Sequence, residues 1–337
     1  MRLVRHNLVA AGIADCRIVV GCSGGPDSTA LLLALSLLAP ELRLGLHVVA
    51  IDHGLRPEAR VEAEAVCQLA GKLGLAAERA SVVVPAGASR QAQARSARYQ
   101  ALAECAGRCA ARFIAVGHTR DDQTETVLMR LLGGAGLTGL AGMALTSPLP
   151  IELAAPIDAP ATLLRPLLTV ARAQVESFLQ PLLPLLAPLP FHDPSNGDPR
   201  YLRARLRRDV LPLLRELAPH LDDRILHLAE QLRADAEHLE SAAGQALQAL
   251  LSDSQAESVT LPVAALASLP RALQARVLHR AARIPLGQRH LEALMGLCRS
   301  QSGAQELNLP TGLHARRQGG LLTLRWPHGR PRAAPIP

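Results

Sequence analysis

Short apolar or β-branched runs alternate with helical segments as far as residue 132, and this alternation restricts the fold more than any other feature. The runs lie at 18–21, 44–51, 80–84 and 112–116, and the segments with helical periodicity at 29–39, 57–73, 88–111 and 121–132. Strands that alternate with helices in this way form βαβ units, whose strands are parallel. The sequence therefore predicts an α/β protein with a doubly wound, mostly parallel sheet.

The pattern changes after Gly133, where helices and turns replace the alternation. Helical segments are predicted at 169–179, 200–217 and 222–251, and a short hairpin at 305–309 and 320–326. A chain of 337 residues is long enough for two domains. We predict one domain at 1–215 and, at 216–337, a linker helix followed by a smaller, mainly helical, basic domain that contains the hairpin.

A loop rich in glycine and hydroxyl groups joins the first strand to the first helix. It consists of Ser23, Gly24, Gly25, Pro26, Asp27 and Ser28. At such a junction the backbone N–H groups of the loop and of the first helical turn point into one concavity, and glycines let an anion come close. Asp27 would repel a phosphate, so we expect it to hold a Mg²⁺ that bridges phosphate oxygens. The loop lacks the Gly-Lys-[Ser/Thr] ending of the Walker A motif, which disfavours γ-phosphate transfer of that type.

The distribution of charge predicts a polyanionic partner. The net charge is +7, and residues 271–337 contain 11 arginines but only 2 acidic residues. Lys72 is the only lysine, so a general preference for arginine explains the type of basic residue but not the scarcity of acidic ones. Nucleic acid fits this asymmetry better than a membrane does. Aromatic residues are too few for an extended base-stacking platform, so we expect phosphate and polar contacts instead.

The cysteines favour a reducing compartment, and the apolar segments do not indicate a membrane span. Cys105 and Cys109 are one helical turn apart, but no second Cys or His pair at ligand spacing accompanies them, so free thiols are favoured over a metal site. No signal peptide is evident, and the most apolar helical stretch, 29–39, is too short to cross a bilayer. We therefore expect a cytoplasmic protein without membrane contact, either a monomer or a homodimer.

The loop at 23–28 resembles the signature Ser-Gly-Gly-x-Asp-Ser of the PP-loop family, the N-type ATP pyrophosphatases. Members of this family have a Rossmann-like sheet, cleave ATP between the α- and β-phosphates, and adenylate an oxygen atom of a second substrate. The resemblance implies that the six loop residues bind ATP and that adenine lies at the end of the second strand, near Ile51 and Asp52. His118, at the end of the fourth strand, either contacts the nucleotide or caps the next helix.

Further segments resemble the tRNA(Ile)-lysidine synthetases within that family. The resemblance covers most of 15–215, and 305–324 resembles the C-terminal substrate-binding domain of those enzymes. The segments that carry it lie at 51–56, 94–99, 117–142, 193–196 and 201–207. It implies ATP and Mg²⁺ as cofactors, and tRNA(Ile) with a CAU anticodon and L-lysine as substrates. In that reaction ATP adenylates the C2 oxygen of the wobble cytidine, and the ε-amine of lysine then displaces AMP to give lysidine.

Two carboxylates and several arginines are the candidate reactive groups. Asp122 and Glu125 are three residues apart, share one helix face and suit a cationic amino acid, and either one fits the role of proton acceptor for the attacking amine. The resemblance assigns lysine binding to both, and the alternative is an acidic helix start favoured by the helix dipole.

Arginines complete the predicted site. The resemblance places Arg98 near the α-phosphate, where a cation stabilises developing charge, and the alternative is a surface arginine. It also assigns contacts with the active site or the tRNA to Arg203, Arg205 and Arg207. A spacing of two residues does not put all three on one helix face, so we expect some of them to serve the structure.

The main alternative function is that of a PP-loop tRNA thiolase with the same adenylation chemistry. Such enzymes usually have Lys at the position of Pro26 and cysteines that handle sulfur, whereas this chain has no Cys-x-x-Cys pair. Ammonia-using PP-loop ligases do not explain the basic C-terminal fifth. A non-catalytic RNA-binding protein does not explain why Asp27, Arg98, Asp122 and Glu125 are all present.

Overall fold

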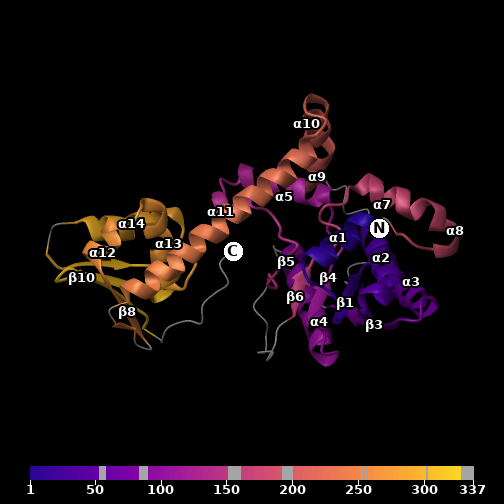
Figure 1. Cartoon of the computed structure of the whole chain (residues 1–337), viewed down its shortest axis with the longest axis horizontal. Helices are drawn as coiled ribbons and strands as arrows, with labels where there is room; N and C mark the ends of the chain where they lie inside the picture. The colour runs from indigo at the N-terminus through magenta and orange to yellow at the C-terminus, as the bar shows by residue number, and fades with distance from the viewer. Residues whose placement is uncertain are drawn as a thin grey trace. The chain divides into compact units, whose positions relative to one another are not determined.

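The chain divides into two units with separate cores (Figure 1). The computed structural model describes residues 1–52, 58–82, 90–150, 161–191, 200–251, 253–254, 257–300 and 303–327. The N-terminal unit comprises 1–136 and 140–229, and the C-terminal unit 137–139 and 230–337, so the division falls within the long helix α11 (Leu221–Leu250). The functional boundary between 215 and 216 stays a prediction. Within the described ranges, no helix combines the length and the apolar character needed to cross a membrane.

A six-stranded sheet forms the centre of the N-terminal unit. Its strands are β1 (Arg17–Cys22), β2 (Gly45–Asp52), β3 (Ala76–Ser81), β4 (Phe113–Ala115), β5 (Thr146–Ser147) and β6 (Thr162–Leu164). The spatial order is β3-β2-β1-β4-β6-β5, and every pair is parallel except β5 with β6. The predicted doubly wound, mostly parallel sheet is confirmed. β5 and β6 were not predicted, because each is too short to show the period-two alternation of a strand.

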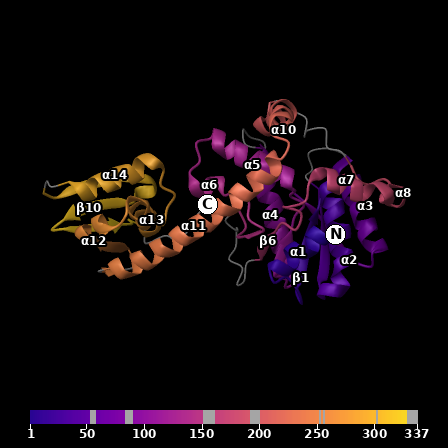
Figure 2. The ribbon, with the colours of Figure 1, turned by 45° about the horizontal axis from the view of Figure 1, so that its top comes forward.

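Helices cover both faces of this sheet. The helices along this part of the chain are α1 (Arg2–Ala10), α2 (Pro26–Leu42), α3 (Glu58–Lys72), α4 (Arg90–Arg108), α5 (Arg120–Leu132), α6 (Leu137–Leu140), α7 (Arg172–Leu179), α8 (Leu183–Leu186), α9 (Leu202–Arg205) and α10 (Leu211–Leu217), with the 3₁₀ turn η1 (Gln180–Leu182) and the π-helical turn η3 (Leu206–Val210). α2, α3 and α7 pack on the face that carries Val20 and Val48, and α4 packs on the face that carries Val19 and Val49 (Figure 1 and Figure 2). Alternate residues of a strand point to opposite faces, so the apolar runs of β1 and β2 contribute to both cores.

The third strand begins earlier than predicted. The prediction placed it at 80–84, whereas β3 pairs with β2 from His47 opposite Ala76 to Asp52 opposite Ser81. The strand sequence, Ala-Ala-Glu-Arg-Ala-Ser, contains none of the β-branched or aromatic residues that favour strands. Hydrogen bonds to β2, and not local preference, therefore decide its conformation.

The C-terminal unit has its own antiparallel sheet. Its strands are β7 (Asp253–Ser254), β8 (Ser258–Pro262), β9 (Gln305–Asn308), β10 (His314–Gln318) and β11 (Leu321–Arg325), in the order β7-β8-β11-β10-β9. The other elements are α12 (Val263–Ser268), α13 (Arg271–Ala282), α14 (Gln288–Arg299) and the 3₁₀ turn η4 (Pro310–Gly312). Leu261, Leu278 and Leu324 lie in the core that these helices and strands share.

Both predicted hairpin strands exist, but each pairs with β10 and not with the other. The segments predicted to pair, 305–309 and 320–326, correspond to β9 and β11, and β10 lies between them and pairs with both. The tight turn joins β10 to β11 through Gly319 (φ 58°) and Gly320 (φ 78°). Two central residues with positive φ are typical of the type I′ turn, which is why glycines occupy both positions.

Candidate functional site

The loop after β1 closes on itself through the hydroxyl group of Ser28. This hydroxyl donates to the carbonyl oxygen of Gly25 (3.0 Å) and accepts from the N–H of Ser23 (3.2 Å). Ser28 itself lies in the first turn of α2, which has Gly25 as its N-cap and Pro26 at its first position. The first N–H groups of a helix have no acceptor within it, so this end of α2 offers them to an anion.

Two glycines let neighbouring segments pack directly against the loop. Gly24 has a φ of +79°, a Cβ there would lie 3.1 Å from Cδ2 of Phe191, and its carbonyl oxygen accepts from the Phe191 N–H (2.8 Å). A Cβ at Gly117, which follows β4, would lie 2.9 Å from the carbonyl carbon of Asp27. The segments that leave β1 and β4 therefore meet at the carboxyl edge of the sheet, where open α/β sheets bind their ligands.

One carboxylate oxygen of Asp27 is hydrogen-bonded and the other is not. Oδ2 accepts from Nη2 of Arg172, the first residue of α7, at 3.2 Å, whereas Oδ1 is buried and has no hydrogen-bond partner. Burial is the main cause that raises the pKa of Asp27 to about 6, against the lowering effect of Arg172. A hard cation satisfies a buried carboxylate oxygen that lacks a donor, so the residues present fit the predicted Mg²⁺.

Asp122 and Glu125 face two arginines of α9 and η3. Nε of Arg203 donates to Oε2 of Glu125 (2.6 Å), and Nε and Nη2 of Arg207 donate to Oε1 (2.7 Å) and Oε2 (3.0 Å) of the same carboxylate. Nη2 of Arg203 also donates to Oδ1 of Asp122 at 3.1 Å. Glu125 is 1 % exposed, so both of its oxygens are enclosed and already paired.

Asp122 also holds the start of α5. Its Oδ2 accepts from the backbone N–H and the hydroxyl of Thr119 at 2.9 and 3.0 Å. Burial acts to raise the pKa of Asp122, but Arg203 and the Thr119 N–H outweigh it, so this pKa lies below its usual range. Oδ2 of Asp122 therefore caps the start of α5, as the alternative interpretation expected of an acidic residue at this position. Its Oδ1 points towards the arginines.

Three carboxylates thus share three guanidinium groups. Nη2 of Arg172 lies 3.2 Å from Asp27 Oδ2 and 3.8 Å from Asp122 Oδ1, and so links the metal-binding candidate to the lysine-binding candidate. We call the following six residues the acid–arginine cluster: Asp27, Asp122, Glu125, Arg172, Arg203 and Arg207. Their formal charges balance. Sequence analysis missed Arg172, because it belongs to no motif and only its place near a predicted helix start could have marked it.

The three arginines assigned to tRNA have different surroundings. Arg203 and Arg207 are four residues apart and share a face across the junction of α9 and η3, where both bind Glu125. Arg205, between them, is exposed to solvent. Two of the three arginines therefore pair with carboxylates, and one remains accessible, as their spacing in the sequence indicated.

Arg98 and His118 have buried nitrogen atoms without partners. Nε of Arg98, on α4, and Nδ1 of His118 lack a hydrogen-bond partner. Arg95 and Arg98 both act electrostatically on His118, which brings α4 to the end of β4. Burial is the main cause that lowers the pKa of His118 to about 3, so its imidazole is neutral. Unpaired donors beside a neutral ring are suited to a bound anion or base, and Arg98 is half-buried rather than a surface arginine.

Ile51 and Asp52 end β2 next to the loop that follows β1. In the parallel register Cys22 lies opposite Ala50, so the last two residues of β2 extend past the end of β1. Both are buried. The binding of adenine here stays a prediction. Two other segments that resemble the family, 53–56 and 193–196, lie outside the described residues.

A second set of polar contacts fixes the helices that carry the cluster. Arg215, on α10, donates to Asp121 (2.8 Å) and to Asp222 at the start of α11 (2.9 Å). The hydroxyl of Thr124 also donates to Asp222 (2.7 Å), and the backbone N–H of Arg172 donates to Asp121 (2.7 Å). α5, α7, α10 and the first turn of α11 are therefore held together around the cluster.

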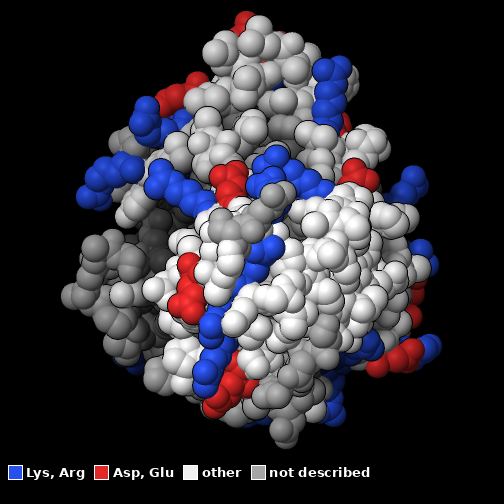
Figure 3. All heavy atoms as spheres, turned by 90° about the vertical axis from the view of Figure 1, so that its left-hand side faces the viewer, with Lys and Arg blue, Asp and Glu red and all other residues white. Residues whose placement is uncertain are grey.

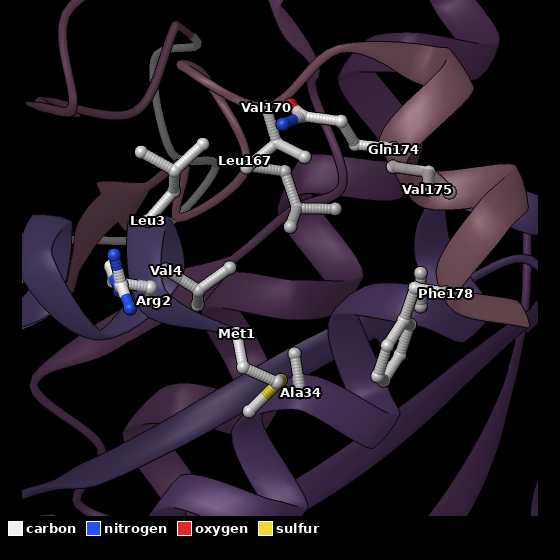
Figure 4. Close-up of a pocket in the computed structure, with 11 residues that line it drawn as sticks. Met1, Arg2, Leu3, Val4, Ala34, Leu167, Val170, Gln174, Val175 and Phe178 are labelled. Atoms are coloured by element: carbon white, nitrogen blue, oxygen red, sulfur yellow. The ribbon is translucent and has the colours of Figure 1, made fainter.

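An apolar pocket lies beside α1, α2 and α7, with a volume of about 190 Å³ (Figure 4). Met1, Val4, Ala34 and Phe178 are among the residues that line it, and Figure 4 shows their side chains around a common space. Its walls are mainly apolar, which suits neither a polyphosphate nor a cation. The acid–arginine cluster, and not this pocket, is therefore the candidate reaction site.

Comparison with known proteins identifies relatives that match most of the chain. Residues 4–214 match the PP-loop domain family. The tRNA(Ile)-lysidine synthase of Salinispora tropica is 39 % identical over 331 residues, which cover 96 % of this chain and 94 % of that enzyme. The synthases of the same name from Salinispora arenicola and Thermobifida fusca are 40 % and 39 % identical, over 91 % of this chain and 90 % and 91 % of their own length.

A solved structure shows a likeness in fold. The U34-tRNA thiolase NcsA from Methanococcus maripaludis, determined with its 4Fe-4S cluster, superposes with a TM-score of 0.53 over 68 % of this chain and 77 % of that one. The two sequences are 19 % identical, so the likeness concerns the fold alone. It agrees with the parallel sheet and adds no support for sulfur transfer.

Proposed function

Because the chain belongs to the tRNA(Ile)-lysidine synthase family of PP-loop ligases, we propose that it attaches L-lysine to C2 of the wobble cytidine in tRNA(Ile) with a CAU anticodon. ATP adenylates the C2 oxygen with release of pyrophosphate, and the ε-amine of lysine then displaces AMP to form lysidine. The observation that carries this proposal is the acid–arginine cluster, which adjoins a phosphate-binding loop at the carboxyl edge of the sheet.

The loop at 23–28 and its neighbours are assigned to ATP. The N–H groups at the start of α2 hold phosphate oxygens, and Arg98 faces the α-phosphate, where negative charge grows as the cytidine oxygen attacks. When bound at Oδ1 of Asp27, Mg²⁺ supplies positive charge that stabilises the pyrophosphate leaving group. The unpaired buried atoms of Asp27 and Arg98 support these two assignments.

Asp122 and Glu125 are assigned to lysine. A carboxylate binds the ammonium form by charge-assisted hydrogen bonds, and one of the two accepts its proton so that the amine is neutral when it attacks. Arg203 and Arg207 occupy the oxygens of Glu125, so the entry of lysine there requires a guanidinium group to move. When ATP and tRNA bind, the guanidinium group turns towards their phosphates, which are anions.

Incorporation of labelled lysine tests this reaction. Transfer RNA with a CAU isoleucine anticodon is incubated with labelled lysine and Mg²⁺, and we expect label in the tRNA with ATP and none without it. An ATP analogue with a methylene bridge between the α- and β-phosphorus atoms serves as the matched control, because it binds but cannot release pyrophosphate. If tRNA caused release of AMP but no lysine were incorporated, adenylation of the tRNA would be supported and lysine would be refuted as the nucleophile. A sulfur donor would then be the next candidate.

The C-terminal unit supplies a basic surface for the tRNA. Figure 3 shows one face of the molecule, on which basic side chains (blue) form a band with acidic ones (red) beside it. Arg271, Arg289, Arg299 and Arg325 are exposed in this unit. Because phosphate contacts are electrostatic, we assign these side chains, together with Arg205, to the backbone of the tRNA.

Neutralising two of these arginines is expected to weaken tRNA binding. Both Arg289 and Arg299 lie on α14 and are exposed, so the double variant Arg289→Gln/Arg299→Gln should fold normally. We expect the slope of log K against log salt to fall by about 0.7–0.9 for each phosphate that the variant no longer binds. The charge-matched control is Arg43→Gln/Arg108→Gln, which removes two exposed arginines of the N-terminal unit that pair with acidic residues. Equal affinity and slope in all three proteins would contradict this assignment.

A further inference from the structure

Three side chains with metal-ligating atoms converge at the end of the sheet remote from the phosphate-binding loop. Sγ of Cys105 and Sγ of Cys109 are 3.9 Å apart, and His47 offers a ring nitrogen such that all three ligand atoms lie within 4.8 Å of one another. His47 is near the start of β2, whereas Asp52, the residue assigned to the nucleotide, is at its end. This group therefore takes no part in the proposed reaction.

Secondary structure brings these three residues together. Cys105 is on α4 and Cys109 directly follows it; four residues apart, they lie on one helix face, and the Cys109 N–H still donates to the carbonyl oxygen of Cys105 (2.9 Å). His47 alternates with Val49 along β2, so it points to the sheet face on which α4 packs. Arg17 of β1 donates to the carbonyl oxygen of Cys109 (3.0 Å), which fixes the end of the helix against the sheet.

Protein encloses the Nε2 atom of His47 and the whole side chain of Cys105. Nε2 of His47 is buried and has no hydrogen-bond partner. Burial, followed by Glu78 and Cys109, raises the pKa of the Cys105 thiol well above its usual range. Glu78, on β3, lies opposite Val49 of β2 and pairs with Arg108 at 2.5 Å. An unsatisfied imidazole nitrogen and two thiols are a donor set that suits a divalent cation.

We propose that His47, Cys105 and Cys109 bind a zinc ion as its three protein ligands. In a tetrahedral site with Zn–S bonds of about 2.3 Å, two sulfur atoms lie about 3.8 Å apart, close to the separation found here. Sulfur and imidazole ligands select zinc over Mg²⁺ or Ca²⁺, which prefer oxygen. The zinc ion replaces the two thiol protons, which pass to solvent, so no electron transfer is involved.

The site serves stability rather than catalysis. It ties the C-terminal end of α4 to β2, and α4 also carries Arg98, which is assigned to the α-phosphate. A metal bound only by the folded chain adds its binding free energy to folding. Zinc should therefore raise the unfolding temperature and hold α4 in place, without touching the substrate.

Metal analysis of the purified full chain tests the proposal. The protein is reduced, loaded with zinc and dialysed against metal-free buffer, and zinc is then measured by mass spectrometry. We expect about one zinc ion per wild-type chain and almost none in Cys105→Ser/Cys109→Ser. Cys67→Ser, which removes a half-buried thiol from α3, is the matched control and should keep its zinc.

Two further measurements keep the test decisive if the double variant does not fold. Cobalt in the wild-type protein should give the sulfur-to-metal absorption and intense visible bands of a tetrahedral thiolate site, and His47→Gln should weaken these bands. A chelator should lower the unfolding temperature of the zinc-loaded wild type by roughly 5 °C. Equal zinc content in wild type and double variant would mean an adventitious ion only, and a metal-free protein with a Cys105–Cys109 disulfide would equally overturn the proposal.

Discussion

Asp27→Asn is expected to lower the tRNA-dependent release of pyrophosphate by about 10³-fold, because it removes the carboxylate oxygen assigned to Mg²⁺ and keeps the shape of the side chain. The fold should persist, since the side chain keeps its shape and its amide oxygen still accepts from Arg172. The affinity for tRNA should stay nearly the same, because Asp27 lies at the phosphate-binding loop and not on the basic surface. Pyrophosphate release and filter binding of tRNA measure the two quantities.

The control for this variant is Asp15→Asn, which neutralises an exposed carboxylate that pairs with Arg43. It should release pyrophosphate at the wild-type rate. If Asp27→Asn retained more than about a tenth of the wild-type rate, the assignment of the metal to this oxygen would be wrong. If its tRNA affinity fell to the same degree as its activity, the loop would act in tRNA binding and not in adenylation.

Glu125→Gln is expected to impair the use of lysine more than the formation of the adenylate. The substitution removes the negative charge that binds the lysine ammonium, so the KM for lysine should rise by about 10²-fold, the equivalent of about 2–3 kcal/mol for one charge-assisted hydrogen bond. Pyrophosphate release with tRNA and ATP alone should change less, because Glu125 has no assigned contact with ATP. Single-turnover measurements of the two steps separate these effects.

Stability has to be measured with the same variant, because Glu125 also binds Arg203 and Arg207. The substitution leaves Asp122 as the remaining carboxylate near the half-buried Arg203 and Arg207, so a lower unfolding temperature is expected. Glu104→Gln, on the exposed side of α4, is the matched control and should change neither stability nor kinetics. An equal decrease in the rates of both steps at saturating lysine would count against a lysine pocket at Glu125.

Several conclusions about the active site were accessible from contiguous segments. The loop at 23–28 combines a strand, glycines, a carboxylate and a helix start within a few residues, so its local geometry follows from its own sequence. The spacing of Asp122 and Glu125 likewise places them on one helix face without knowledge of the fold. The alternation of strands and helices was enough for the doubly wound sheet, although β5 and β6 were too short to be recognised.

Pairs that are distant along the chain are known only from the folded structure. Arg172 binds Asp27 across 145 residues and Arg203 binds Glu125 across 78, and no local pattern links either pair. His47 of β2 meets Cys105 only because α4 packs on the sheet face to which His47 points. Local conformational preference decides where a loop or helix begins, but burial and charge pairing between elements decide which side chains meet. The chemistry of the loop could thus be recognised in the sequence, whereas the acid–arginine cluster and the candidate zinc site depend on tertiary packing.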